Sequence, residues 1–198
     1  MKHFFVGAGD FGKELFYCSD FYDPIVFSGF VDLKKKKDIL SIDVFSKFKK
    51  KTHYTVTIGD PKKRYEVFKI LKNKKLLINK KIVFRSVNLS KNVSIGDGSI
   101  LMHNVYLANN VKIGKNCHIH GNSIVGHNSQ IDDNVTIGAG VFIGGHSKIG
   151  MGTIIHPNSV ILKNKIIGKN CSVGSGSVVF QNLSDNISVF GVPAKRII

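Results

Sequence analysis

Residues 113–140 read IGKNCHIHGNSIVGHNSQIDDNVTIGAG, and an aliphatic residue returns in them at every sixth position. The period continues in both directions without a break, and its aliphatic members are Leu89, Ile95, Leu101, Leu107, Ile113, Ile119, Val125, Ile131, Ile137, Ile143, Ile149, Ile155, Ile161, Ile167, Val173 and Val179. Four residues after most of them stands a small or β-branched residue, although Lys165 and Leu183 depart from this rule. A fixed six-residue period predicts a parallel β-helix.

The physics of the repeat explains this pattern. Each hexapeptide forms one short face and one corner, so three successive hexapeptides close one triangular coil. The aliphatic residue points inward, the small residue fits beside a corner, and Gly, Asn and Asp supply the positive φ that corners need. Because no single coil buries its own face, stability is a sum over stacked neighbours.

Positions 1–85 lack this period and alternate predicted strands with predicted helices. The expected strands are residues 2–6, 25–31, 55–58 and 82–84, and the expected helices are 11–21, 43–50 and 61–72. The last helix has Pro61 at its first position, after Asp60 as its cap. We therefore expect a small parallel α/β sheet of the Rossmann-like kind over 1–85, an all-β left-handed parallel β-helix over 86–184, and a tail over 185–198.

A glycine motif, Gly7-x-Gly9-x-x-Gly12, follows the first predicted strand and opens the first predicted helix. Asp32 closes the second strand, twenty residues after Gly12. A loop of this kind offers backbone N–H groups and a helix N-terminus to a phosphate. The domain holds only about half of a dinucleotide-binding fold, which favours a nucleotide or nucleotide sugar over a redox cofactor. A tight turn without any ligand is the alternative.

Composition limits the partners. The chain has 198 residues and a formal net charge of +16, which fits either an anionic ligand or a composition that is simply rich in lysine and asparagine. No segment has the length of a membrane span and no signal peptide is evident, so we expect a cytoplasmic protein without membrane insertion. The repeat has no groove-reading helix, so we expect no nucleic-acid partner.

Histidines in the middle coils raise the alternative of a metal site: His118, His120, His127 and His146. A γ-class carbonic anhydrase is also a trimeric left-handed β-helix and holds zinc on three histidines. Here the closest pair is His118-x-His120, and the accompanying pattern of Arg, Gln and Glu is absent. We therefore expect no metal.

A small Rossmann-like domain followed by hexapeptide repeats resembles one bacterial family. This family is the sugar O-/N-acyltransferases typified by sialic acid O-acetyltransferase (NeuD) and UDP-4-amino-sugar N-acetyltransferase (PglD). The motifs that carry the resemblance are Gly7 to Gly12, Gly29-Phe30-Val31-Asp32, Ile58-Gly59-Asp60 with Arg64, Ser123-Ile124-Val125-Gly126-His127, and Gly191-Val192-Pro193-Ala194-Lys195. Each is short, but their order and spacing cover essentially the whole chain.

The resemblance implies acetyl-CoA as co-substrate, a nucleotide sugar as acceptor, and a homotrimer that binds the coenzyme between neighbouring β-helices. It also implies that His127 is catalytic. The residues expected to bind the nucleotide sugar are Gly7, Gly9, Asp10, Phe11, Gly12, Asp32, Gly59 and Arg64. The residues expected along the coenzyme path are Thr136, Gly145, His146, Gly174, Ser175 and Lys195.

The position of His127 supports its role independently. It follows the inward Val125 by two residues and so faces outward at a corner, and the same place one coil later is Gly145. This pair leaves a slot along the prism for a pantetheine arm, with the Gly145 N–H free to meet a thioester oxygen. The alternative is a solvated corner histidine.

Asn128 follows His127 at a place where the family commonly has Glu or Asp. An amide can accept a hydrogen bond from the ring, but it adds no charge. We therefore expect either that Asp132 or Asp133 orients the ring, or that His127 is a weaker base, which suits an amine acceptor.

These observations together predict an acetyl-CoA-dependent N-acetyltransferase acting on a nucleotide-linked amino sugar, of the UDP-4-amino-sugar kind, for surface glycan or glycoprotein biosynthesis. Transfer would be direct, with His127 as general base and Asn128 beside it. Two alternatives stay open. One is an O-acetyltransferase acting on a sugar hydroxyl, of the sialic acid type, and the other is a non-catalytic trimer that binds nucleotide sugars.

Overall fold

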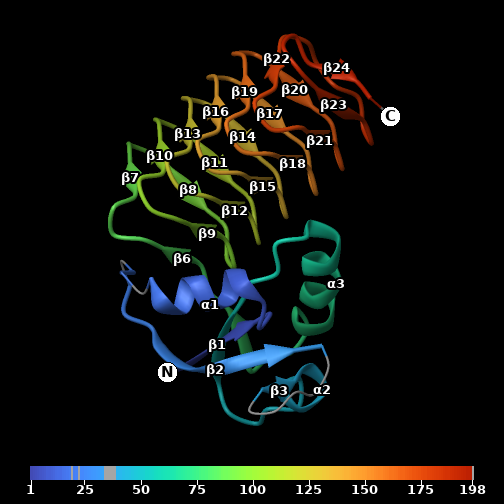
Figure 1. The fold of residues 1–198 in the computed structure, drawn as a ribbon. Helices are drawn as coiled ribbons and strands as arrows, with labels where there is room; N and C mark the ends of the chain where they lie inside the picture. The colour runs from blue at the N-terminus through green and yellow to red at the C-terminus, as the bar shows by residue number, and fades with distance from the viewer. Residues whose placement is uncertain (19, 22, 34–38, 198) are drawn as a thin grey trace.

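A five-stranded parallel sheet forms the amino-terminal part of the structure, a computed structural model that describes residues 1–18, 20–21, 23–33 and 39–197 (Figure 1). Its elements are β1 (Lys2–Val6), α1 (Asp10–Tyr17), β2 (Val26–Asp32), β3 (Leu40–Ser41), α2 (Ile42–Phe45), β4 (Thr52–Val56), α3 (Pro61–Leu71) and β5 (Leu77–Asn79). The strand order is β3-β2-β1-β4-β5, which confirms the expected small parallel α/β fold. The order reverses beside β1, so the loops after β1 and β4 flank the crevice where α/β sheets bind ligands.

Strand β1 is buried on both faces, as a continuous apolar run predicts. Phe4 and Val6 pack in one cluster with Phe45 of α2. Phe5 packs on the opposite face with Leu15 of α1. Helix α3 begins as predicted, because the Asp60 side chain accepts the Lys63 N–H at 2.8 Å. Helix α1 ends at Tyr17, earlier than the expected residue 21.

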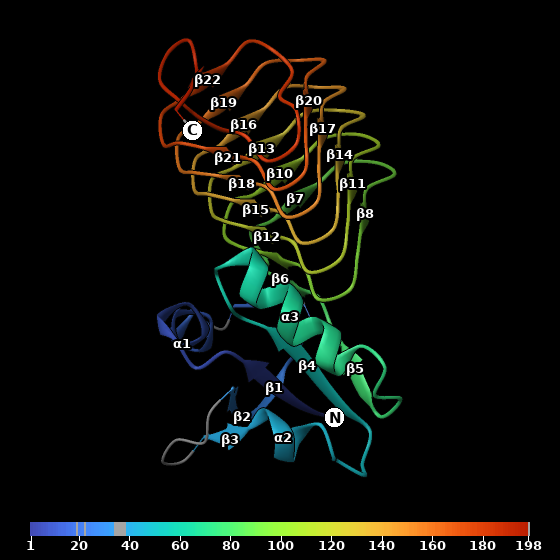
Figure 2. The same ribbon diagram turned by 90° about the vertical axis from the view of Figure 1, so that its right-hand side faces the viewer.

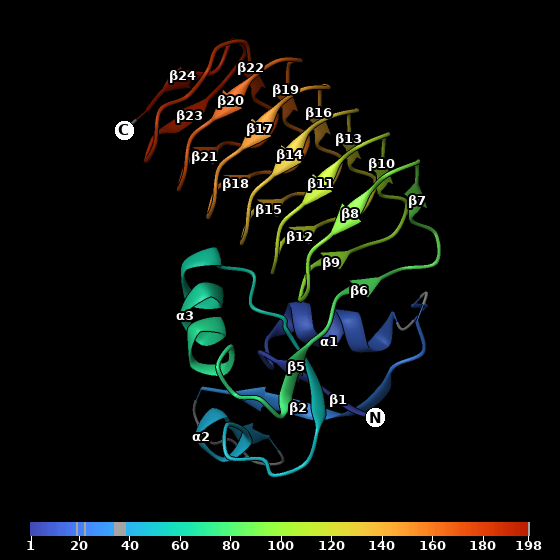
Figure 3. The same ribbon diagram turned by 180° about the vertical axis from the view of Figure 1, so that it is seen from behind.

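Residues from Ile82 onward form a triangular prism of stacked coils on top of this sheet (Figure 2). The prism has three sheets, and we name two of them by their outward residues. The apolar sheet consists of β7 (Asn88–Leu89), β10 (Tyr106–Leu107), β13 (Ile124–Val125), β16 (Phe142–Ile143), β19 (Val160–Ile161) and β22 (Val178–Val179). The polar sheet, seen in Figure 3, consists of β8 (Ser94–Ile95), β11 (Lys112–Ile113), β14 (Gln130–Ile131), β17 (Lys148–Ile149) and β20 (Ile166–Ile167).

The third face, the junction sheet, contacts the amino-terminal part. It consists of β6 (Ile82–Val83), β9 (Ile100–Leu101), β12 (His118–Ile119), β15 (Thr136–Ile137), β18 (Ile154–Ile155), β21 (Ser172–Val173), β23 (Ser188–Phe190) and β24 (Lys195–Arg196). Neighbouring strands pair at a constant offset of three hexapeptides through the middle coils, as between His118 and Thr136. This register confirms the parallel β-helix of three-hexapeptide coils predicted from the period.

Two boundaries differ from expectation. Ile82–Val83 pairs with Ile100–Leu101 as the first strand of the prism, and Leu77–Asn79 is the strand that completes the amino-terminal sheet. Both short apolar segments fit either sheet, so the period alone did not separate them. The expected tail adds two strands to the junction sheet, and Phe190 pairs antiparallel with Lys195.

The interior of the prism follows the predicted pattern. Aliphatic residues from Leu101 to Val179 are buried and stack in columns. Leu89 is 44% exposed because the apolar sheet begins there and no coil lies beneath it. The small inward residues close the corners, as where the Ser123 hydroxyl donates to the carbonyl of Gly138 at 2.8 Å.

The corners have the left-handed backbone that was expected of Asn and Gly. The non-glycine residues with positive φ are Asn92, Asn104, Asn110, Asn116, Asn122, Asn128, Asn134, His146, Asn158, Asn164, Asn170 and Asn186. Asparagine tolerates this conformation better than most residues. Among the helices of the described residues, none is both long and apolar enough to cross a membrane.

Arg64 of α3 joins the two parts. It is fully buried, and its guanidinium donates to Asn116 O at 3.0 Å and to Asn134 O at 3.0 Å on the prism. On its own side it donates to the carbonyls of Ile58 at 3.0 Å and Gly59 at 2.9 Å. Burial lowers the pKa of Arg64 to about 10, so the side chain stays cationic at neutral pH. Because this one side chain bonds both parts, we infer that it fixes their relative position.

Candidate functional site

His127 lies in a groove of about 860 Å³ at the corner between the apolar and polar sheets. The groove is built from three successive coils, and its lining residues are Gly126, His127, Phe142, Gly144, Gly145, His146, Leu162, Lys163 and Asn164. His127, Gly145 and Lys163 occupy the same corner place in these coils, each one coil after the last. The expected pair of a histidine and a glycine is therefore brought together in one cavity.

The ring of His127 lies directly over Gly145. A Cβ added to Gly145 would lie 2.9 Å from His127 Nε2, so only glycine leaves room for the ring as it stands. The Gly145 carbonyl accepts the Asn164 N–H at 2.9 Å. Its own N–H has no hydrogen-bond partner within the part of the chain that the structure describes. A free N–H beside a histidine is the arrangement expected for a thioester oxygen site.

Asn128 and the imidazole of His146 both contact the ring of His127. Asn128 Nδ2 donates to His127 Nδ1 at 3.0 Å and lies 3.5 Å from His146 Nε2. The two imidazole rings meet edge to face, with centroids 4.9 Å apart and planes at 89°. His146 therefore contacts the expected catalytic residue and lines the groove expected for the coenzyme.

The two aspartates proposed to orient His127 do not reach it. Asp133 accepts the Lys115 N–H at 2.7 Å, and Asp132 accepts from Gln130 at 3.3 Å. Both belong to the corner between the polar and junction sheets, so this expectation is wrong.

The glycine motif occupies the carboxyl end of the amino-terminal sheet, as predicted. Gly7 has φ of 123° and donates its N–H to Val31 O at 2.7 Å, and a Cβ on Gly12 would clash with the Gly7 carbonyl oxygen. Gly9 precedes α1, and open space surrounds its Cα. Asp32 is half-buried at the end of β2 and accepts the Leu33 N–H at 2.7 Å.

Three other residues expected to bind the sugar lie near this loop. Asp10 is exposed in the first turn of α1, and open space surrounds the Gly59 Cα after β4. The Phe11 ring contacts the prism, with its centroid 5.1 Å from that of His118 and 5.2 Å from that of His120. The loop therefore lies next to the junction sheet.

Arg64 and Thr136 were expected to contact ligands, but both lie at the junction between the amino-terminal part and the prism. Arg64 is 0% exposed and saturated by protein acceptors, so it contributes to domain packing and not to substrate contact. Thr136 accepts a hydrogen bond from Arg64 Nη2 at 2.9 Å and faces the same junction, away from His127. The motif that suggested a substrate role for Arg64 did not reveal that the prism covers it.

Three residues expected along the coenzyme path lie elsewhere in the protomer. Gly174 and Ser175 form a corner between the junction and apolar sheets, and Gly174 packs beneath Phe190. Lys195 belongs to β24 at the last coil and lines a separate hollow of about 400 Å³. None of the three lines the groove of His127.

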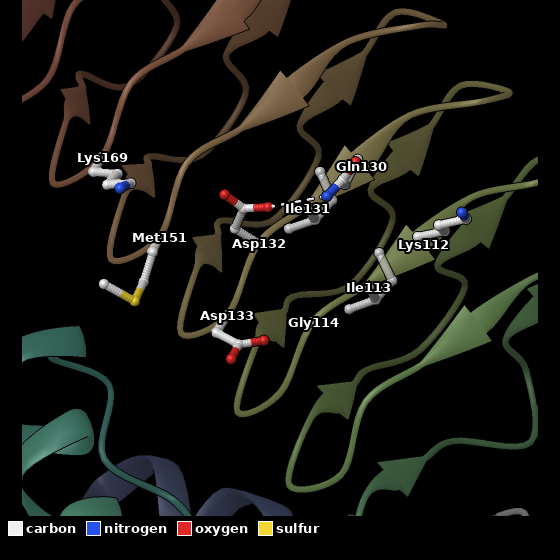
Figure 4. Close-up of a pocket in the computed structure, with 9 residues that line it drawn as sticks. All are labelled: Lys112, Ile113, Gly114, Gln130, Ile131, Asp132, Asp133, Met151 and Lys169. Atoms are coloured by element: carbon white, nitrogen blue, oxygen red, sulfur yellow. Dashed lines mark hydrogen bonds between the residues drawn. The ribbon is translucent and has the colours of Figure 1, made fainter.

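Another hollow, of about 440 Å³, opens on the polar sheet (Figure 4). Lys112 and Lys169 lie toward its two ends, with Asp132 and Asp133 between them. Its charges balance and its carboxylates already accept protein hydrogen bonds, so the arrangement indicates no particular ligand.

His118 takes part in the contact between the amino-terminal part and the prism. His118 is fully buried, its Nε2 donates to Val56 O at 3.0 Å, and its Nδ1 lies 3.4 Å from Arg64 Nη1. Burial, assisted by the Arg64 charge, lowers the pKa of His118 well below 6.5, so the ring is neutral. Within the described ranges, no group of three or more His, Cys, Asp or Glu side chains is arranged to hold a metal ion.

The outward face of the apolar sheet is hydrophobic beside the groove. Its outward residues from β10 to β22 are Tyr106, Ile124, Phe142, Val160 and Val178. Phe142 is 43% exposed and also lines the groove. Tyr106, Ile124 and Phe142 are exposed, and Val160 and Val178 are half-buried. An apolar stripe of this kind is typical of an interaction surface.

Sequence analysis missed Phe142, Leu162 and Lys163 as groove residues. The signal was present, because Lys163 follows Gly145 by one coil and Phe142 follows the outward Ile124 by one coil. The six-residue period is visible in the inward aliphatic residues, whereas the outward positions vary in residue type and do not stand out in the sequence.

Comparison with known proteins identifies the repeat. Residues 92–127, 110–145 and 146–181 match the family described as bacterial transferase hexapeptide (six repeats). A search of curated proteins finds no match.

Three solved structures share the fold over nearly the whole chain. A histidine-to-alanine variant of GDP-perosamine N-acetyltransferase from Caulobacter crescentus, in complex with CoA and GDP-perosamine, is 19% identical at a TM-score of 0.88, covering 99% of this chain and 96% of that chain. The acetyltransferase domain of PglB from Neisseria gonorrhoeae, in complex with acetyl coenzyme A, is 20% identical at 0.84, covering 99% and 98%. WeeI from Acinetobacter baumannii is 26% identical at 0.78, covering 100% of each chain. The hexapeptide transferase repeat and these matches confirm the expected resemblance to the NeuD/PglD-like type.

Proposed function

We propose that the protein transfers an acetyl group from acetyl-CoA to the amino group of a nucleotide-linked sugar in the cytoplasm, for surface glycan or glycoprotein biosynthesis. The observation that carries this proposal is the groove in which His127 lies over Gly145, within hexapeptide transferase repeats. The solved structures with the same fold include acetyltransferases bound to CoA and to a GDP-sugar, which supports both halves of the reaction.

In the proposed reaction, the sugar amine attacks the thioester carbon of acetyl-CoA. The C–N bond forms as the C–S bond breaks, the CoA thiolate leaves, and His127 takes the proton that the amine loses. The Gly145 N–H donates to the thioester oxygen as negative charge develops on it. The exposed ammonium of Lys163, one coil further along the groove, is placed to attract the phosphates of the coenzyme.

The nucleotide part of the sugar is assigned to the loop after β1. Gly7, Gly9 and Gly12 keep side chains away from the start of α1, where free N–H groups favour a phosphate. Asp32 at the end of β2 is placed to bind a ribose hydroxyl. A nucleotide sugar bound there would present its amine near the junction sheet.

The complete site then requires a second copy of the chain. Among the described residues of 1–85, none lines the groove of His127, whereas the glycine loop lies beside the opposite edge of the apolar sheet, near His120. Packing three prisms through their apolar stripes would cover Ile124 and its neighbours. It would also bring the loop of one subunit toward the groove of the next. We therefore propose a homotrimer.

Thiol release from acetyl-CoA, measured with a panel of UDP-, GDP- and CMP-linked sugars, tests the reaction. A 4-amino sugar should give the fastest release, and the His127→Ala variant should lose about 10²- to 10⁴-fold in rate while keeping its fold. His53→Ala in the amino-terminal sheet is the control and should keep its rate. Faster release with a hydroxyl acceptor would favour the O-acetyl alternative, and no release with any sugar would favour a binding protein.

Two measurements test the sugar site and the assembly. Asp32→Ala should weaken nucleotide-sugar binding in calorimetry and leave acetyl-CoA affinity unchanged. Ile124→Asp should dissociate the trimer in light scattering, because it places charges in the stripe. An active monomeric wild-type protein, or tight NAD binding at the glycine loop, would contradict the assignment.

A further inference from the structure

His146 is the exception among the described corners that have a positive φ, because asparagine or glycine occupies all the others. Its φ is 58°. The amide side chain of asparagine bonds locally in this backbone, which suits it to the repeated corner. A departure from asparagine and glycine at a corner that lines the groove beside His127 points to a function at that place.

The asparagines along this corner form a ladder of side-chain hydrogen bonds. Asn92 Nδ2 donates to Asn110 Oδ1 at 3.1 Å, and Asn110 Nδ2 donates to Asn128 Oδ1 at 2.9 Å. The next rung is His146, which has no amide to continue the ladder. Asn128 Nδ2 is therefore shared between His127 Nδ1 at 3.0 Å and His146 Nε2 at 3.5 Å.

This arrangement determines where His127 carries its proton. An amide nitrogen only donates, so Nδ1 of His127 accepts and the neutral ring holds its hydrogen on Nε2. A base that acts through Nε2 needs the opposite tautomer, with Nδ1–H facing an acceptor. A half-turn of the Asn128 amide supplies that acceptor, because it brings Oδ1 to the ring. Asn110 is exposed, so water compensates the bond it then gives up.

His146 can bond the Asn128 amide in either orientation. Its Nε2 accepts from Nδ2 when unprotonated and donates to Oδ1 when protonated. The edge-to-face contact with His127, at 4.9 Å between centroids, also limits how that ring can rotate over Gly145. An asparagine in the place of His146 would instead continue the ladder and hold the amide with Nδ2 directed along it.

We propose that His146 is a positioning residue for His127, acting through Asn128 and by direct ring contact. It lets the Asn128 amide turn and so gives His127 the tautomer that a base requires. This inference rests on the proposed function, in which His127 is the general base.

The His146→Asn variant separates this role from a structural one. Asparagine suits the corner, so Tm should rise, whereas kcat should fall about 10- to 100-fold as the geometry of His127 is lost. KM for acetyl-CoA should change less than kcat, because the backbone and the other lining residues of the groove stay the same. Asn104→His makes the reverse exchange at a corner outside the groove. It should lower Tm and leave kcat as in the wild type.

Nitrogen NMR of ¹⁵N-histidine-labelled protein gives a readout without substrate. The His127 signals, assigned by their loss in His127→Ala, should report both tautomers in the wild type and only the Nε2–H tautomer in His146→Asn. An unchanged pattern, or kcat within about twofold of wild type, would overturn the proposal. The NMR comparison decides the role of His146 even if the protein transfers no acetyl group, the result that would refute the proposed function.

Discussion

Replacing Arg64 by lysine should destabilise the whole fold. The buried guanidinium donates hydrogen bonds of 2.9–3.1 Å to six oxygen acceptors, which are Ile58 O, Gly59 O, Asn116 O, Asn134 O, Asn134 Oδ1 and Thr136 Oγ1. A lysine ammonium has three N–H groups, so at least three of these acceptors would lose their partner. Water can reach Ile58 O, Gly59 O and Thr136 Oγ1, which are in partly buried contacts, but not the other three acceptors. Leaving a buried polar group unpaired costs about 1–3 kcal/mol, so the variant should lose about 1–3 kcal/mol or more. That loss is a large fraction of the stability of an ordinary domain.

Guanidinium unfolding, followed by circular dichroism and by tyrosine fluorescence, measures this loss. Arg85→Lys is the matched control, because the Arg85 side chain is 66% exposed and its ion pair with Asp20 spans 3.4 Å. An exposed pair contributes about 0–1 kcal/mol, so the control should unfold close to the wild type. If Arg64→Lys kept wild-type stability and only weakened nucleotide-sugar binding, the argument from burial would be wrong and the substrate role would be restored.

Three further predictions concern the groove, acid stability and metals. Gly145→Ala should lower kcat about 10²-fold, because the new Cβ would lie 2.9 Å from His127 Nε2 and displace the ring, whereas Tm should change little. Burial lowers the pKa of His3 to about 4 and that of His118 well below 6.5. As the pH falls, these two side chains therefore bind protons in the unfolded chain before they do so in the folded protein. Stability should therefore be intact above pH 6.5 and fall as the pH drops toward 4. The loss of folding free energy assigned to His3 is about 3 kcal/mol. The denaturant midpoint should therefore fall less between pH 6.5 and pH 4 in His3→Gln than in the wild type. Chelator treatment should leave activity unchanged, and activity restored by added zinc would disprove this.

The residues that point into the prism could be predicted almost completely from the six-residue period. Six-residue spacing sets which side chains stack inside, and the three-hexapeptide coil places Gly145 beside His127. The glycine motif likewise located the end of β1, because a tight turn between strand and helix restricts the residues allowed there.

Contacts between distant segments could not be predicted in this way. Arg64 follows a family motif, but only the docked prism shows that its charge is buried against Asn134. Thr136 lies at a position that was assigned to the coenzyme, yet it faces the junction. The role of His146 needed the corner conformation and the direction of the asparagine ladder, which depend on three coils at once.

Because the prism has a constant cross-section, the number of its coils can change without changing the shape of each coil. Each coil rests only on its two neighbours, so whole coils can be gained or lost in evolution without redesigning the rest. A coil inserted between His127 and Gly145 would pull the pair apart, whereas one added beyond Asn164 would only lengthen the groove. His118, which contacts the amino-terminal part, lies half a coil before His127, so the two residues share one coil. Moving the His127 corner by one coil would therefore shift the proposed thioester site by about 4.8 Å relative to the nucleotide sugar.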